Sequence, residues 1–320
     1  MKMLLLFALA VVASANASAQ QDFPARPVRI IVGFPPGGSS DVSARLVADH
    51  MKDEWKQAVI VENKPGASGT IAAAYVAAAP ADGYTLLHLG PGTHAISSAM
   101  YPKLSYDAVQ SFVGVGQIAV SPFVLVVSAS SGFKALPDLL EAARAKPGQL
   151  SYGSSGSGAG PHLVAEIIAA ATGTKFLHVP FKGAAPATAA AVAGQVDFAM
   201  VDSASAIAHV KSGRLRALAV STEQRSPLYP DVPTVSEGGV RGFAYPSSVG
   251  ISAPAGTPEA TVRKINAALN RALANDAIRE RLNGLGFVAA PMSPEEFGTF
   301  VSGEVRKYGK VVRDLGLKID

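Results

Sequence analysis

An α/β protein of two lobes is expected from this chain for three reasons. Short apolar runs alternate with stretches at helical spacing, a pattern typical of helices that cover mostly parallel sheets. About 300 of the 320 residues remain after a predicted export signal, and this length favours two lobes over one core. Glycine-rich loops at residues 33–41 and 153–162 each join a predicted strand to a predicted helix, one in each expected lobe.

The first 19 residues have the three parts of a cleavable export signal. Lys2 supplies the positive start, residues 3–13 form an apolar core too short to span a membrane, and residues 17–19 (Ala-Ser-Ala) form a cleavage site. The mature chain is expected to begin at Gln20 or Gln21, and a buried N-terminal helix is the alternative. No later run is long and apolar, so a soluble mature protein is expected.

The composition indicates the bacterial periplasm and a small-molecule partner. The chain has no cysteine, which excludes disulfides, thiol catalysis, cysteine metal sites and a lipid anchor at the cleavage point. An exported chain of this size without disulfides fits the periplasm better than a eukaryotic extracellular space. Hydrophobic residues make up 48% and charged residues 16%, which suits a compact globular protein. The net charge of +4, or +3 without Lys2, favours small anions and not nucleic acid.

Predicted strands are short apolar runs between turn signals, and predicted helices carry apolar residues at helical spacing. The strands are expected at residues 28–32, 59–62, 85–89, 114–120, 123–127, 150–153, 176–179, 198–201, 215–220 and 249–253. The helices are expected at residues 41–55, 70–79, 137–145, 162–171, 184–193, 205–211, 258–274, 276–285 and 294–315. One junction is especially clear, because Thr257, Pro258 and Glu259 predict the N-cap, first position and acidic first turn of a helix.

The chain is expected to cross between the lobes near residues 120–123 and to return near residues 245–249. This order assigns residues 22–122 and 246–320 to the first lobe and residues 123–245 to the second. The C-terminal helices would then complete the first lobe. In the first of these helices, an apolar stripe at helical spacing is expected to lie in the core and consists of Val262, Ile265, Leu269 and Leu273.

The first glycine loop predicts an anion site made from backbone. Gly37 and Gly38 have no Cβ, so the loop can turn tightly and allow a ligand to touch the main chain. The helix that follows directs its free N–H groups and the positive end of its dipole at the same place. The alternative is an ordinary strand-to-helix turn in which Ser39 or Ser40 is the N-cap.

The second glycine loop repeats this arrangement in the other expected lobe. Four glycines alternate with serines in residues 153–160, and Pro161 suits the first turn of the next helix. Backbone N–H groups and hydroxyls there are donors for an anion, and a flexible surface loop is the alternative. A ligand carboxylate between the two loops would accept hydrogen bonds from both, and closure of the lobes would strengthen these bonds by excluding water.

Six motifs spread over the mature chain together resemble the Bug (TctC-type) solute receptors, the periplasmic binding components of tripartite tricarboxylate transporters. Each motif is short, and their combination is far more specific than any one of them. They lie at residues 34–41 (FPPGGSSD), 63–69 (NKPGASG), 80–86 (PADGYTL), 179–183 (VPFKG), 194–197 (GQVD) and 253–258 (APAGTP).

The resemblance implies a type II periplasmic-binding-protein fold, in which two α/β lobes enclose a ligand cleft. It implies a carboxylate ligand, held mainly by backbone amides and ordered waters. The ligand-binding residues implied on the first side are Phe34, Gly37, Gly38, Ser39 and Asp41. Those implied on the second side are Ser155, Gly156, Ser157, Gly158, Ala159, Gly160 and His162, with Lys182, Asp202 and Ser203 bordering the cleft.

Several of these residues have a structural alternative. Asp41 favours a helix N-terminus in any case, and Asp202 is placed to cap the helix that follows it. Lys182 fits a solvated turn, and His162 fits a packed helix position better than a ligand contact. Phe34 is expected to be an apolar part of the cleft wall.

The chain departs from the family pattern where the far end of the ligand is read. Ala159 replaces a hydroxyl residue found in many relatives, and Ser203-Ala204-Ser205 replaces an Asn-containing stretch. Residues 245–249 lack a tryptophan that relatives often carry before Gly250. The chemical class of the ligand therefore stays open among a dicarboxylate, an acidic amino acid and an aromatic acid.

Enzyme motifs are weak or absent in this sequence. It has no Gly-x-Ser-x-Gly elbow, no Gly-x-Gly-x-x-Gly and no Walker loop, and the Ser-x-x-Lys at residues 131–134 lacks its partner motifs. The six histidines show no metal-ligand spacing, so neither a metal nor a cofactor is expected. The favoured function is a monomeric receptor that passes its ligand to membrane transporter subunits. A periplasmic enzyme on the same scaffold and a ligand-sensing receptor partner are the alternatives.

Overall fold

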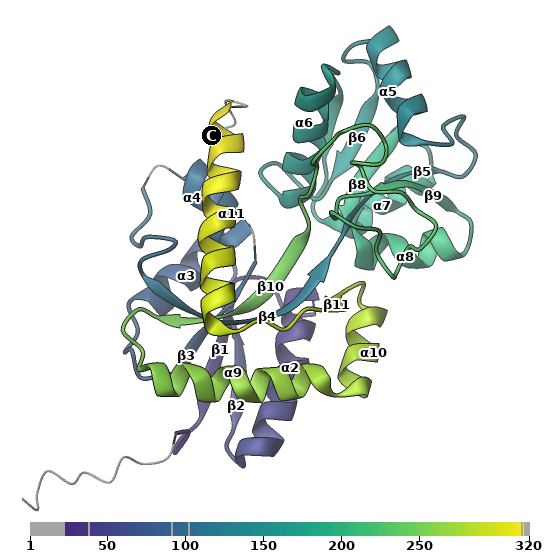
Figure 1. Ribbon diagram of the computed structural model, residues 1–320. Coiled ribbons are helices and arrows are strands. Elements are labelled where there is room, and N and C mark those ends of the chain that lie inside the picture. Colours follow the sequence, from purple (N-terminus) through teal and green to yellow (C-terminus); the bar gives the residue numbers. More distant parts are fainter. Residues whose placement is uncertain (1–22, 38, 91, 102, 315, 317–320) are drawn as a thin grey trace, which may run out of the picture.

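The computed structural model describes residues 23–316 apart from residues 38, 91, 102 and 315. The predicted export signal lies outside the described residues. The described chain forms two α/β lobes, each built on its own sheet (Figure 1). The predicted α/β class with two lobes is confirmed.

Six strands form the sheet of the first lobe, in the spatial order β11-β4-β10-β3-β1-β2. β1 pairs in parallel with β2 and β3, so that Ile30 lies opposite Val61 and Leu86. The loop after β1 therefore opens at the carboxyl edge of this sheet, where open α/β sheets bind ligands. The strands are β1 (Val28–Val32), β2 (Val59–Asn63), β3 (Thr85–Leu89), β4 (Phe112–Ser121), β10 (Ser247–Pro254) and β11 (Val288–Ala289).

Five strands form the sheet of the second lobe, in the order β7-β6-β8-β5-β9. β6 pairs in parallel with β7 and β8, so the second glycine loop also opens at a carboxyl edge. The strands are β5 (Phe123–Ser128), β6 (Ser151–Ser154), β7 (Leu177–Pro180), β8 (Phe198–Asp202) and β9 (Leu215–Val220).

The expectation of mostly parallel pairing is wrong, because five of the nine strand pairings among the described residues are antiparallel. The strands β5 and β10, which begin where the chain changes lobes, make four of these five pairings, and the short strand β11 makes the fifth with β4. β5 enters the second sheet antiparallel to β8 and β9, and β10 returns antiparallel to β3 and β4. Most strands of each sheet still run in one direction, as alternation of strands and helices requires.

Each predicted helix is present, with ends within two residues of those expected. The helices are α2 (Ser39–Trp55), α3 (Thr70–Ala77), α4 (Ser97–Met100), α5 (Leu136–Ala145), α6 (Gly160–Thr172), α7 (Ala184–Val192), α8 (Ser203–Lys211), α9 (Glu259–Ala274), α10 (Asp276–Gly284) and α11 (Pro294–Asp314). The short elements η1 (Ala67–Gly69), η2 (Gly92–Ile96), α4 and β11 were not predicted, because they are too short to show a period. No helix among the described residues is both long and apolar enough to cross a membrane.

The start of α9 differs from the expected cap. Thr257 donates its hydroxyl hydrogen to the carbonyl of Pro254 at 2.8 Å, so it stabilises the preceding turn and does not cap the helix. Pro258 takes the N-cap position, and the helix begins at Glu259. The apolar stripe of this helix is buried as predicted, in a cluster with first-lobe strands.

The chain passes between the sheets at two places. Only Pro122 separates β4 from β5, and β10 begins after Pro246. The predicted lobe boundaries at 122/123 and 245/246 stay a prediction, which this sheet membership supports. Close to the crossing the lobes touch, because a Cβ on Gly286 of the first lobe would lie 2.6 Å from the backbone nitrogen of Ala204.

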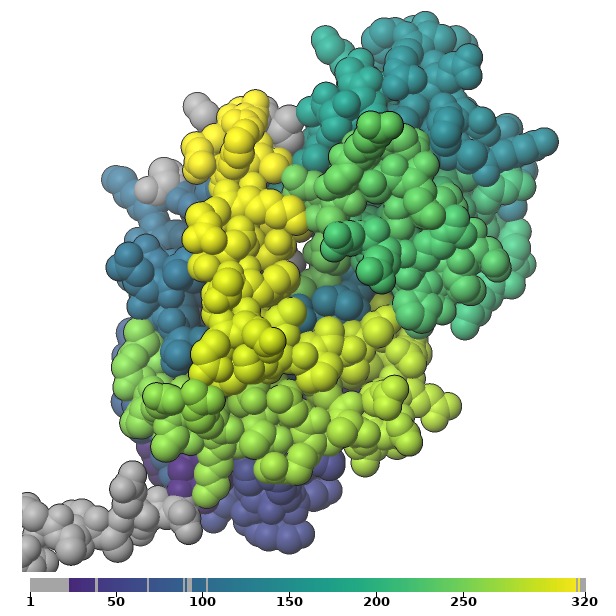
Figure 2. All heavy atoms as spheres, in the orientation of Figure 1, coloured from purple at the N-terminus to yellow at the C-terminus, as the bar shows by residue number. Residues whose placement is uncertain are grey.

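α11 packs against first-lobe elements, and its second half also contacts the segment that leads into β10, where Lys307 Nζ donates to the Ala244 carbonyl and the rings of Tyr308 and Tyr245 lie 5.6 Å apart. That the C-terminal helices complete the first lobe stays a prediction. Near the start of α11, Phe297 belongs to a buried cluster with Ile31. Near its end, Tyr308 and Val312 share a buried cluster with Leu163 and other second-lobe residues. Figure 2 shows this helix in yellow beside the teal and green second lobe.

Candidate functional site

A cleft of about 770 Å³ lies between the two lobes. The first glycine loop borders it from one lobe and the second glycine loop from the other. The two crossing segments, the starts of α7 and α8 and the turn after α10 also line it. The lining residues are Phe34, Pro35, Pro36, Gly37, Ser40, Gly90, Ser121, Phe123, Ser155, Gly156, Ser157, Gly158, Ala159, Gly160, Pro161, Gly183, Ala184, Asp202, Ala204, Ser247, Ser248, Val249, Leu285 and Phe287.

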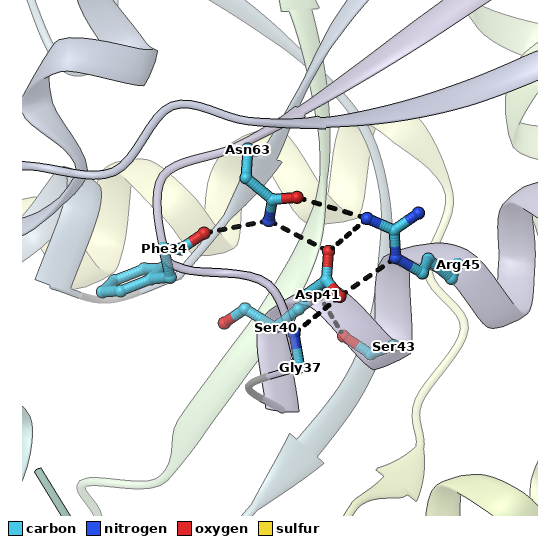
Figure 3. Close-up of polar contacts among 7 residues, drawn as sticks. All are labelled: Phe34, Gly37, Ser40, Asp41, Ser43, Arg45 and Asn63. Atoms are coloured by element: carbon cyan, nitrogen blue, oxygen red, sulfur yellow. Dashed lines mark hydrogen bonds and ion pairs between the residues drawn. The ribbon is translucent and has the colours of Figure 1, made fainter.

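Asp41 binds the first loop through a network of hydrogen bonds (Figure 3). Its carboxylate accepts a hydrogen bond from the Gly37 backbone N–H at 2.9 Å and from both Nε and a terminal nitrogen of Arg45, at 3.0 and 2.9 Å. Asn63 Nδ2 donates to the same carboxylate at 2.9 Å and to the carbonyl of Phe34 at 2.9 Å. The network therefore fixes the two loop residues, Phe34 and Gly37, that face the cleft.

The electrostatics of Asp41 fit this supporting position. The side chain is only 4% exposed, and the hydrogen bond from Arg45, with those from Gly37 and Asn63, lowers the pKa of the carboxyl to about 2. All four polar contacts bring donors to the carboxylate, so its ionised form is stabilised. Asp41 is not among the residues that line the cleft.

A second network, which contains two histidines, positions the second glycine loop. Ser154 Oγ lies 2.7 Å from His178 Nε2, and the rings of His162 and His178 stack with centroids 4.2 Å apart. The Gly158 backbone N–H donates to His162 Nδ1 at 3.1 Å, so this nitrogen carries no proton. Burial lowers the pKa of His162, which agrees with a neutral ring. His162 thus positions the loop and is not among the residues that line the cleft.

The start of α6 presents backbone donors to the cleft, whereas in the loop before it the N–H groups of Gly156 and Gly158 donate to Ser154 Oγ and His162 Nδ1. Gly156 and Gly158 have φ of 129° and 76°, a region that favours glycine. No side chain caps the first turn of α6, whose N-cap is Ala159. The N–H groups at the start of this helix are therefore available to an anion.

The described cleft wall lacks the positive charge that is common in sites for anions. None of its residues is a lysine or an arginine, and Asp202 is its one charged residue. Any anion held here would be bound by backbone N–H groups, hydroxyls and water. This is the kind of site that the glycine loops predicted.

The structure brings most of the predicted site residues to the cleft. Those that line it are Phe34, Gly37, Ser155, Gly156, Ser157, Gly158, Ala159, Gly160 and Asp202. Four others lie off its wall: Asp41 and His162 as described, Lys182 as an exposed residue, and Ser203 fully buried with its hydroxyl 3.2 Å from that of Tyr229. Gly38 lies outside the described residues, and Ser39 is the first residue of α2.

Asp202 does not cap α8, contrary to one of the two predicted roles. It stands at the N-cap position, but its side chain makes no cap hydrogen bond. Asp202 lines the cleft at the end of β8, and burial of its carboxyl group raises its pKa to about 6.

Asp202 apart, sequence reasoning missed the cleft residues that come from outside the glycine loops, and within the loops it missed Pro35, Pro36, Ser40 and Pro161. The predicted crossing points gave a signal for Ser121, Phe123 and Ser247–Val249, because a cleft between lobes must be floored by the crossing segments. Leu285 and Phe287 had no such signal, since they follow a helix that looks like ordinary core packing.

Comparisons with known proteins agree on one family. The profile described as "Tripartite tricarboxylate transporter family receptor" matches residues 43–317. Protein BugT of Bordetella pertussis is 33% identical over 93% of this chain and 91% of its own length. A protein of R. palustris solved with adipate has a TM-score of 0.82 at 34% identity, covering 93% of this chain and 100% of that one. MatC from Rhodopseudomonas palustris with bound malate has a TM-score of 0.77 at 33% identity, covering 91% and 100%.

Proposed function

The chain belongs to the Bug (TctC-type) family of tripartite tricarboxylate transporter receptors, and we propose that it captures a small organic carboxylate in the periplasm. One observation carries the proposal: two glycine loops from opposite lobes line one cleft whose described wall has no cationic side chain. Backbone N–H groups at helix starts suit a carboxylate. The adipate and malate seen in the two structural relatives are both carboxylates.

The physical basis of capture is closure of the lobes on the bound acid. The first loop is fixed by Asp41 and the second by His162, so each lobe presents a preformed half of the site. When the lobes approach, water leaves and the hydrogen bonds to the carboxylate become stronger. The thin connections at Pro122 and Pro246 are where a hinge would move.

Delivery to membrane transporter subunits is the partner role that we propose, with the receptor acting as a monomer. A signalling partner that recognises the closed form is the alternative use of the same motion. Catalysis on this scaffold is disfavoured, because the cleft wall described here offers one carboxylate and hydroxyls without a histidine base.

Ligand capture is tested by thermal unfolding of the mature protein with dicarboxylates, amino acids, aromatic acids and neutral sugars. At a hundredfold excess over Kd, binding stabilises the fold by about 2.7 kcal/mol, so one acid should raise Tm by about 5 °C. Small-angle X-ray scattering should show a smaller radius of gyration with that acid, and the acid should be recovered unchanged. Stabilisation by a neutral sugar and by no acid would contradict the proposal, and product formation would favour an enzyme.

Export is proposed from the N-terminal segment and the family. We expect the protein in the periplasmic fraction of its bacterial host, with an N-terminus at Gln20 or Gln21. N-terminal sequencing of that fraction measures this directly. Recovery of chains that still begin at Met1 would contradict cleavage.

A further inference from the structure

The only charged residue on the described cleft wall has the same sign as the proposed ligand. Asp202 is the last residue of β8, in a cleft that is otherwise apolar or neutral and polar. A partly buried carboxylate without a cationic partner is costly, and a second carboxylate facing it would add repulsion. Asp202 therefore limits which chemical groups of a bound ligand can face it.

Among the described residues no cationic group lies against this carboxylate, and its hydrogen bond from the protein is the one from its own backbone N–H. Its side chain makes no cap hydrogen bond to α8, although it stands at the N-cap position. Ser203 and Ser205, the nearest hydroxyl residues along the chain, are directed elsewhere: Ser203 Oγ donates to the Tyr229 hydroxyl, and Ser205 Oγ donates to the Asp202 carbonyl. Burial is the main cause that raises the pKa of Asp202 to about 6, which leaves the group mostly ionised at neutral pH.

Asp202 also lies close to the second glycine loop. It pairs with Phe123 across β8 and β5, and Gly160 lies over the Phe123 ring, where a Cβ would come within 2.6 Å of Cζ. Asp202 and the loop therefore border the same part of the cleft.

We propose that the cleft selects an acid that also carries a hydrogen-bond donor, an ammonium or hydroxyl group, and that this donor binds the carboxylate of Asp202. This inference rests on the proposed carboxylate-binding function and narrows its ligand class. The ammonium form binds most tightly, because it adds charge neutralisation to the hydrogen bond. A donor-free dicarboxylate binds least, because its second carboxylate meets Asp202.

Two matched ligand sets test this proposal by calorimetry at pH 7. The first is adipate, 6-hydroxyhexanoate and 6-aminohexanoate, and the second is succinate, malate and aspartate. In the set that binds more tightly, the ammonium member should have a Kd about tenfold or more below that of the donor-free diacid, with the hydroxyl member between. Equal or tighter binding of the donor-free diacid overturns the proposal and leaves carboxylate capture intact.

The variant Asp202→Asn tests the same proposal independently. The variant keeps the shape of the side chain and removes its charge, so the Kd values of the three matched ligands should differ by no more than about threefold. The donor-free diacid should bind the variant more tightly than it binds the wild type. Asp231→Asn, an exposed second-lobe position, is the matched control and should keep the wild-type ranking. An unchanged ranking in Asp202→Asn overturns the proposal. If neutral sugars or simple amines bind and no acid does, the proposed function itself fails.

Discussion

Asp41→Asn should lower the free energy of unfolding by about 2 kcal/mol at pH 7 and weaken ligand binding about tenfold. The carboxylate accepts hydrogen bonds from Gly37, Asn63 and Arg45, all of which are donors. An amide places its own NH₂ against one of them, so one donor loses its partner and the charge that attracts Arg45 is removed. Urea unfolding and calorimetry with the identified ligand measure the two effects.

The sign of the pH dependence follows from the lowered pKa. Asp41 has a pKa of about 2 in the folded protein and about 4 in the unfolded chain. Its stabilising contribution is therefore complete above about pH 4 and disappears as the pH falls through 2. The difference in unfolding free energy between wild type and Asp41→Asn should shrink across that window.

Asp53→Asn is the matched control for this experiment. Asp53 is exposed on the same helix, so its replacement should change the unfolding free energy by less than about 0.5 kcal/mol. A stability difference for Asp41→Asn that stays constant from pH 7 to pH 2 would show that its charge is not what holds the first loop.

The local signals in the sequence predicted the elements well, because strands, helices and glycine turns are each determined largely by neighbouring residues. The direction of each strand relative to its neighbours was harder to predict from the sequence. β5 and β10 run against their neighbours because the chain changes lobes there, and no local pattern in residues 123–128 or 247–254 records which sheet neighbour each strand meets.

The candidate site was predicted in part for the same reason. Glycine loops are visible in the sequence, and both lie on the cleft. The role of Asp202 could not be predicted, because it depends on the orientation of the side chain. An aspartate at this helix start can either cap α8 or face the cleft. The assignment of α11 to the first lobe follows from the order of the crossings, and the amphipathic pattern of this helix predicts burial of Tyr308 without indicating which residues surround it.

Gly160→Ala should weaken ligand binding about tenfold and cost about 1–3 kcal/mol of stability. Gly160 is the first residue of α6 and lines the cleft. A Cβ there would lie 2.6 Å from Phe123 Cζ and 3.2 Å from Cε2. The ring is only 4% exposed and belongs to the second-lobe core, so it cannot simply swing away. The start of α6, with its free N–H groups, must retreat from the cleft.

Two further variants separate this steric effect from a general effect of alanine. Gly132→Ala adds a Cβ with nothing within 4 Å, so affinity and stability should stay near wild type. Phe123→Leu removes the ring tip that the new Cβ meets, at a cost of about 1 kcal/mol by itself. Combined with Gly160→Ala, it should recover most of the lost affinity, with a coupling energy of about 1 kcal/mol in the double-mutant cycle. Simple additivity of the two substitutions would mean that the ring does not set the position of α6, and the loss of affinity would then need another cause.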